Sequence, residues 1–120
     1  HSLLMGEARS LGMPARFIIG FPLPSDRPRG VIKGYHCWAE IHVEGTGWLP
    51  VDASEASKHP EKKDMFFGGL DAHRVAFTVG RDIVPPGSRT GPLNFIIYPH
   101  VEADGVGHGG VITEFSFEEI

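Results

Sequence analysis

Residues 35–52 read YHCWAEIHVEGTGWLPVD, and this stretch decides the fold. From Tyr35 to Glu44 the side chains alternate between two faces, which is the pattern of a β-strand. Gly45-Thr46-Gly47 is typical of a turn, and Trp48 to Asp52 continues as a second strand. The stretch therefore predicts an antiparallel β-hairpin.

The sequence around this hairpin predicts one helix and several more strands. Gly12 and Pro14 mark the end of a helix, because glycine favours the left-handed cap and proline stops the helix. The expected fold class is α+β: a short N-terminal helix packed on an antiparallel sheet, forming a single domain over residues 1–120. The predicted elements are a helix over 3–11, strands over 15–21, 75–79, 93–102 and 111–117, a loop over 22–30, and a loop over 54–64 that can include one helical turn.

Composition excludes several classes of function. The chain has 120 residues, enough for one compact domain. Its net charge of −4 offers no basic surface for nucleic acid. A single cysteine, Cys37, permits neither an internal disulfide nor a thiolate zinc site. No apolar run is long enough to span a bilayer, so we expect no membrane insertion, and no motif implies a cofactor or metal.

His36 and Asp52 carry the chemistry that the hairpin suggests. A histidine can remove a proton from a thiol or hydroxyl, and a carboxylate can orient the imidazole. With a two-residue turn Asp52 would lie opposite Ala39 and point away from His36. The pair therefore requires an odd-length loop near Glu44 or a bulge, and we predict one.

Other interpretations of these residues remain open at this point. His36 can be an interior histidine with satisfied hydrogen bonds, and Asp52 can cap the bend that follows it. Cys37 is not the expected nucleophile, because adjacent residues of a strand point to opposite faces. Trp38 and Trp48 either line a substrate groove or belong to the core.

Two charges in apolar surroundings predict an ion pair. Arg16 is the charged residue of the strand over 15–21, and Glu40 lies on the His36 face of the hairpin. Charges in such surroundings are usually paired, so we expect a structural salt bridge between them. Asp71, Arg74 and the Arg81-Asp82 pair suggest a similar network, without a catalytic role.

Three motifs in order resemble the core of the transglutaminase-like superfamily of papain-like thiol enzymes. They are Gly12-Met13-Pro14-Ala15-Arg16, His36-Cys37-Trp38-Ala39-Glu40 and Gly47-Trp48-Leu49-Pro50-Val51-Asp52. The resemblance covers residues 1 to about 54. Less specifically, residues 67–71, 74–77 and 80–82 look like a bacterial branch of the family.

The resemblance implies a Cys-His-Asp triad on a papain-like fold. His36 matches the general base, and Asp52 matches its orienting carboxylate. Separately from the resemblance, we assign Trp38 to substrate binding, as the groove interpretation suggests. The family's nucleophilic cysteine has no match and would lie about four residues before His1. Because the chain begins with histidine and its first helix has a poor beginning, we expect it to be incomplete at the N-terminus.

The expected function is that of a fragment of a cysteine protease or amidase acting on protein or peptide amide bonds. The chain alone is expected to be inactive, since it lacks the nucleophile. The alternative is a non-catalytic module that binds a peptide or protein on the same fold. The sequence does not separate protease, transglutaminase and deamidase activities. We expect apolar surface at the shortened helix to favour self-association, and a cytoplasmic location is favoured slightly over the periplasm.

Overall fold

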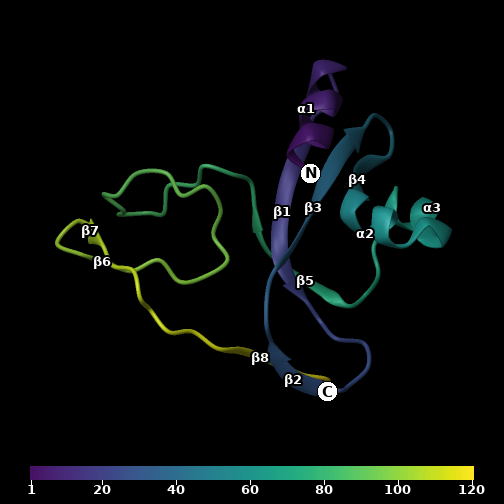
Figure 1. The fold of residues 1–120 in the computed structure, drawn as a ribbon. Coiled ribbons are helices and arrows are strands. Elements are labelled where there is room, and N and C mark those ends of the chain that lie inside the picture. Colours follow the sequence, from purple (N-terminus) through teal and green to yellow (C-terminus); the bar gives the residue numbers. More distant parts are fainter.

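The computed structural model describes residues 1–120, and Figure 1 shows the arrangement of its elements. An N-terminal helix is followed by strands, a cluster of short helices and a long C-terminal segment. In chain order the elements are α1 (Ser2–Ser10), β1 (Ala15–Pro22), β2 (Arg29–Ile32), β3 (His36–Val43), β4 (Gly47–Val51), α2 (Ala53–Lys58), the 3₁₀ helix η1 (Pro60–Lys62), α3 (Lys63–Phe66), β5 (Arg74–Val79), β6 (Glu102–Ala103), β7 (Val106–Gly107) and β8 (Phe115–Glu118).

The main sheet has four strands in the order β4-β3-β1-β5, and all neighbouring strands are antiparallel. Helix α1 packs against β1 and β3 (Figure 1). The sequence explains where α1 ends, because Gly12 adopts φ 80° just after the helix and turns the chain into β1. The predicted α+β class, with a short N-terminal helix on an antiparallel sheet, is confirmed.

The two faces of the sheet have different neighbours. The face under α1 holds a core that includes Met5, Phe17, Ile19 and Ala39. The alternate residues of β1 and β3 point to the opposite face, as the two-residue period of a strand requires. That opposite face carries His36 and is the face on which the candidate site lies.

A β-bulge interrupts the pairing of β1 with β5. Ile19 pairs with Thr78 but Gly20 pairs with Ala76, so β5 contains one extra residue at this point. The close approach of the strands requires glycine at position 20, because a Cβ there would lie 1.8 Å from the carbonyl oxygen of Val75. The bulge changes which residues of β5 share a face with His36.

Gly20→Ala is therefore expected to destabilise the protein by about 2 kcal/mol, because the strands must move apart to admit the methyl group. Urea unfolding followed by circular dichroism measures this change. Gly34→Ala is the matched control, since a Cβ at Gly34 meets nothing within 4 Å. Equal stability of the two variants would contradict the steric requirement at Gly20.

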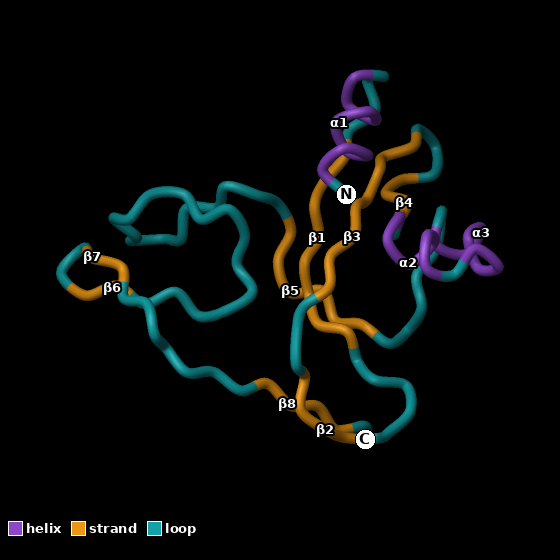
Figure 2. The backbone as a smooth tube through the Cα atoms, viewed as in Figure 1, coloured by secondary structure: helices purple, strands orange, loops and turns teal.

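Outside the main sheet, several predicted boundaries differ from the structure. The predicted loop over 54–64 contains α2, η1 and the start of α3 instead. Strand β2 was missed, and only the end of the predicted strand over 111–117 belongs to β8, which pairs with β2. Figure 2 shows that most of the chain between β5 and β8 is loop. None of the helices is long and apolar enough to cross a membrane.

The prediction of a strand over 93–102 is wrong. Only an isolated bridge between Ile83 and Leu93 and the short β6 form there. The apolar side chains are nevertheless buried: Ile97 belongs to the core and Phe95 packs against it. The segment thus covers the core without joining the sheet, and the hydroxyl of Thr78 donates a hydrogen bond to the Ile96 carbonyl 2.5 Å away.

The predicted ion pair on the sheet is confirmed. Arg16 and Glu40 lie directly opposite each other on β1 and β3. The Arg16 Nε donates to the Glu40 carboxylate at 2.5 Å, and the guanidinium lies 4.1 Å from the centre of the Trp48 ring. The pair is partly exposed, so it fixes side-chain positions and contributes little net stability.

Candidate active site

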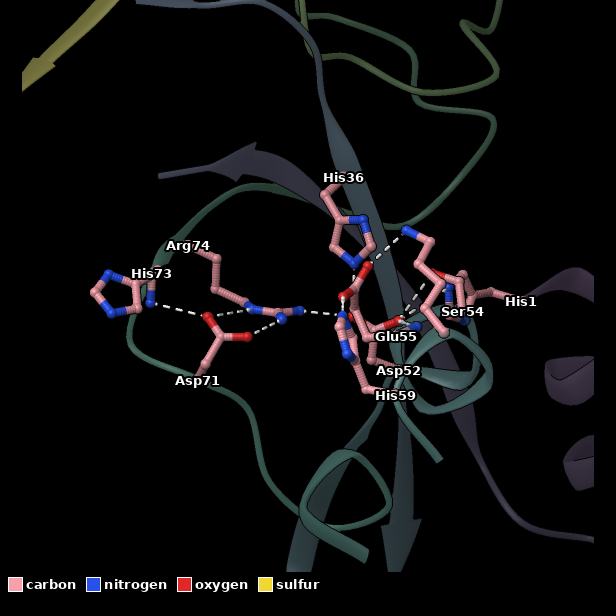
Figure 3. Close-up of polar contacts among 10 residues, drawn as sticks. His1, His36, Asp52, Ser54, Glu55, His59, Asp71, His73 and Arg74 are labelled. Carbon is pink, nitrogen blue, oxygen red and sulfur yellow. Dashed lines mark hydrogen bonds and ion pairs between the residues drawn. The ribbon is translucent and has the colours of Figure 1, made fainter. Parts of the chain in front are cut away.

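His36 and Asp52 are in direct contact. The Nε2 of His36 lies 2.5 Å from Oδ2 of Asp52 (Figure 3). The Asp52 side chain is fully buried, whereas that of His36 keeps 17% of its surface exposed. The other ring nitrogen of His36, Nδ1, has no hydrogen-bond partner in the protein. His36 therefore contacts the buried carboxylate through Nε2, while Nδ1 is not bound by the protein.

The loop between β3 and β4 produces this contact. Val43 pairs with Gly47, so three residues form the loop, and Gly45 at its centre has φ 77°. The predicted odd-length loop is present, centred one residue later than expected. In the same register Ala39 pairs with Val51, so the next residue, Asp52, lies opposite Trp38. Trp38 is on the same face of β3 as His36. The carboxylate reaches the imidazole diagonally rather than from directly across the hairpin.

Four hydrogen-bond donors converge on the Asp52 carboxylate. His36 and Arg74 donate to Oδ2, and the Arg74 Nη1 is 2.7 Å away. The Ser54 hydroxyl and the Glu55 backbone N–H donate to Oδ1, both at 3.1 Å. The last of these bonds makes Asp52 the N-cap of α2, as the alternative interpretation expected. Capping a helix and holding His36 are thus done by different oxygens of one carboxylate.

This hydrogen bonding keeps Asp52 ionised. Burial raises the pKa of the carboxyl group, but the hydrogen bonds from His36, Arg74 and the Glu55 backbone outweigh it and hold the pKa well below its usual range. An ionised carboxylate only accepts hydrogen bonds, so Nε2 of His36 must carry the proton. In the neutral ring Nδ1 is then the acceptor, as a general base requires.

Arg74 fixes the carboxylate from the side of β5. Its side chain is only 8% exposed and also binds Asp71 (Figure 3). The guanidinium lies 5.3 Å from the centre of the Trp38 ring and 5.9 Å from that of Phe66. Arg74 pairs with Pro22 beyond the bulge. Without the bulge its side chain would point to the opposite face of the sheet.

The sequence had placed Arg74 in a network with Asp71, Arg81 and Asp82, and this network forms only in part. Arg74 binds Asp71 and Asp52, whereas Arg81 binds Asn94 and Ser2 instead. The link from Arg74 to the candidate site was therefore missed. The only sequence signal for it was a charged residue at the start of an otherwise apolar strand.

Helix α1 begins beside the same carboxylate. The Nε2 of His1 lies 3.7 Å from Oδ1 of Asp52, and the His1 side chain is only 6% exposed. Both ring nitrogens of His1 are buried without a hydrogen-bond partner. The N-terminal end of α1 therefore lies close to the Asp52 carboxylate.

Cys37 is not positioned to react with His36. It packs against the core under α1, on the face opposite to His36. Burial raises the pKa of its thiol, which leaves little of the nucleophilic thiolate. No other cysteine is present in the sequence. These 120 residues thus bring His36 and Asp52 together without a cysteine beside them.

Trp38 forms part of the floor of the site. The residue is 2% exposed, and the centre of its ring lies 6.4 Å from that of the His36 ring in a stacked arrangement. None of the clefts in the structure is lined by Trp38, so here it has a packing role rather than a place in a groove. Its assignment to substrate binding stays a prediction. Nor do three side chains of His, Cys, Asp or Glu gather as a metal site would need.

The site belongs to the class in which strands of an antiparallel sheet hold a His–Asp pair beside the start of a helix. Residues 1–53 match the model of a family described as the transglutaminase-like superfamily. The matched region runs from the beginning of α1 to one residue beyond Asp52, and so contains both members of the pair. The match supports the resemblance that the three motifs suggested.

An uncharacterized protein of Haemophilus influenzae (strain ATCC 51907 / DSM 11121 / KW20 / Rd) is similar over most of the chain. The two sequences are 30% identical over 136 aligned residues, covering 88% of this chain. The alignment spans only 37% of that relative's length. No solved structure matches.

Proposed function

We propose that the intact protein carrying this chain is a transglutaminase-like thiol enzyme acting on peptide or carboxamide bonds. The observation that carries the proposal is the 2.5 Å contact between His36 Nε2 and a buried, ionised Asp52, which leaves Nδ1 free to accept a proton. Asp52 orients the ring and stabilises the imidazolium that forms during the reaction. His36 is the general base and later the general acid.

The nucleophile in this proposal is a cysteine outside the sequence, about four residues before His1. Two observations support that position. The family resemblance puts its cysteine there, and α1 begins next to Asp52, with His1 only 3.7 Å from the carboxylate. A cysteine at the start of an extended α1 would also lie near the positive end of the helix dipole, which favours the thiolate.

The proposed reaction proceeds through a thioester. The cysteine sulfur attacks the carbonyl carbon while its proton passes to Nδ1 of His36. The C–N bond then breaks, and the leaving amine or ammonia takes that proton from the imidazolium. Attack by water on the thioester releases the carboxylic acid and restores the thiol, which is the hydrolysis we favour. An amine in place of water would give transglutamination by the same steps.

Acylation by p-nitrophenyl acetate tests this proposal without knowledge of the natural substrate. The intact protein should release one equivalent of p-nitrophenolate in a burst as the thioester forms. His36→Ala should slow the burst about 10³-fold or more, because the base is lost. His42→Ala is the matched control, since His42 lies on the same face of β3 but packs against Trp48 instead of Asp52.

The site of acylation decides between an enzyme and a binding module. Iodoacetamide labelling followed by peptide mass spectrometry should find the reactive thiol before His1, with Cys37 unlabelled in the folded protein. Absence of a cysteine from that region of the intact protein, or a burst unaffected by His36→Ala, would overturn the enzyme proposal. The non-catalytic peptide-binding module would then take its place.

A further inference from the structure

A cleft of about 390 Å³ lies between α1, the start of β1 and the segment that follows β5. No residue that contacts Asp52 lines it, so it is separate from the candidate active site. Two arginines bring positive charge to the cleft, Arg9 from α1 and Arg81 after β5, against one carboxylate, Asp82. Arg16 also lines the cleft, but its guanidinium lies on the opposite face of the sheet with Glu40 and Trp48. The cleft thus carries a net positive charge in a chain whose net charge is −4.

The guanidinium groups of Arg9 and Arg81 are held in place but keep unused donors. Arg9 donates Nε and Nη2 to the carbonyl of Ala15. Arg81 is fixed by hydrogen bonds to Ser2 and Asn94. Each guanidinium has five N–H groups, so both retain donors for a further acceptor. The cleft is therefore preorganised for an oxyanion, whose geometry arginine matches.

Gly6 keeps the helix side of the cleft open. It lies in the middle of α1, where glycine is less favourable than any other common residue except proline. A Cβ at Gly6 would meet nothing within 4 Å, so packing does not demand a glycine. A side chain at this position would instead occupy space that belongs to the cleft. An unfavourable residue without a packing reason is consistent with a binding role.

We propose that this cleft binds a small organic anion, with its carboxylate or phosphate group on Arg9 and Arg81. Met5 and Phe17 supply the only apolar lining and would contact the body of the ligand. The Arg81 guanidinium already lies 5.3 Å from the centre of the Phe17 ring, which brings charge and apolar surface together. This inference does not depend on the thiol chemistry proposed above.

We test the inference by titrating the protein with three aromatic probes and monitoring changes in its NMR chemical shifts. Benzoate and phenyl phosphate carry the two candidate head groups, and neutral benzamide has a similar body without the charge. At least one anion should bind saturably at the cleft, and more weakly at high salt because the attraction is between charges. The tighter of the two identifies the head group.

Placing a negative or a positive side chain at Gly6 distinguishes an electrostatic effect on binding from a steric one. Gly6→Glu should weaken binding of the preferred anion about tenfold or more, whereas Gly6→Lys should not weaken it. Gly109→Glu is the control, because a Cβ there also meets nothing within 4 Å; it should change binding less than about twofold. Thermal unfolding should show both Gly6 variants folded, since either side chain improves helix propensity.

Three results would overturn the inference. They are the absence of saturable binding by either anion, benzamide binding as tightly as benzoate, and equal weakening by Gly6→Glu and Gly6→Lys. None of these measurements uses acylation, so failure of the proposed enzyme function would leave them unaffected.

Discussion

Asp52→Asn should slow acylation of the intact protein by p-nitrophenyl acetate about 10³- to 10⁴-fold. The reason is the arrangement of four donors around the two oxygens of one carboxylate. An amide offers one oxygen and one NH₂ group, so it can accept on only one side. Whichever way the amide turns, its NH₂ group faces donors that need an acceptor.

One orientation of the amide in the Asp52→Asn variant leaves His36 in the wrong tautomer. With the amide oxygen toward the Glu55 N–H, the NH₂ group faces Nε2 of His36, to which it donates, and also faces the Arg74 Nη1, which loses its acceptor. The ring proton then moves to Nδ1, which can no longer accept a proton from a thiol. The opposite orientation preserves the ring tautomer and the Arg74 bond, but it removes the negative charge that stabilises the imidazolium. It also leaves the Glu55 N–H facing the NH₂ group and weakens the cap of α2.

Ser54→Ala is the matched control for Asp52→Asn. The Ser54 hydroxyl binds the same carboxylate at Oδ1 but does not contact His36. Its removal should change the burst rate less than about threefold, because three donors and the ionised state remain. A burst rate of Asp52→Asn within about tenfold of the wild type would mean that Asp52 only caps α2 and plays no part in orienting the base.

The hairpin that carries the site could be predicted from sequence because its information is local. Strict alternation from residue 35 to 44 fixes which side chains share a face. Contact between His36 and Asp52 then requires a loop with an odd number of residues. The structure has a three-residue loop around Gly45. Burial and turn chemistry within eighteen residues were sufficient for this part of the fold.

The role of Arg74 could not be predicted, because it depends on the bulge between β1 and β5. Which face Arg74 points to is set by one extra residue in β5, and the bulge is revealed only by the register in which β1 and β5 pair. The strand prediction for residues 93–102 is wrong for a related reason. The apolar pattern of this segment indicates burial of Phe95 and Ile97, which occurs, but does not say whether its backbone finds a strand partner.

Arg74→Met should destabilise the protein by about 3–5 kcal/mol at pH 7, because it leaves Asp52 buried with one charged partner fewer. Methionine keeps much of the volume against the Trp38 and Phe66 rings, so loss of packing contributes less. Urea unfolding followed by tryptophan fluorescence measures the change. Arg29→Met is the control: Arg29 is exposed and forms no ion pair, so the change should stay within about 0.5 kcal/mol.

The pH dependence identifies the cause of this loss. In the wild type the low pKa of Asp52 stabilises the fold above the unfolded carboxyl pKa of about 4. That stabilisation is lost as the pH falls toward the folded-state pKa. In Arg74→Met, burial remains while one hydrogen bond is lost, so the pKa of Asp52 rises. The stability difference between the two proteins should therefore be largest near neutral pH and shrink below about pH 4.

Two outcomes would contradict this account of Arg74. A difference that stays constant from neutral pH to about pH 3 would show that Arg74 acts through packing on the Trp38 and Phe66 rings alone. No loss of stability at pH 7 would show that His36 and the Glu55 backbone are enough to hold the ionised carboxylate. In either case the bulge at Gly20 would still shape β5, but it would have no part in keeping Asp52 charged beneath His36.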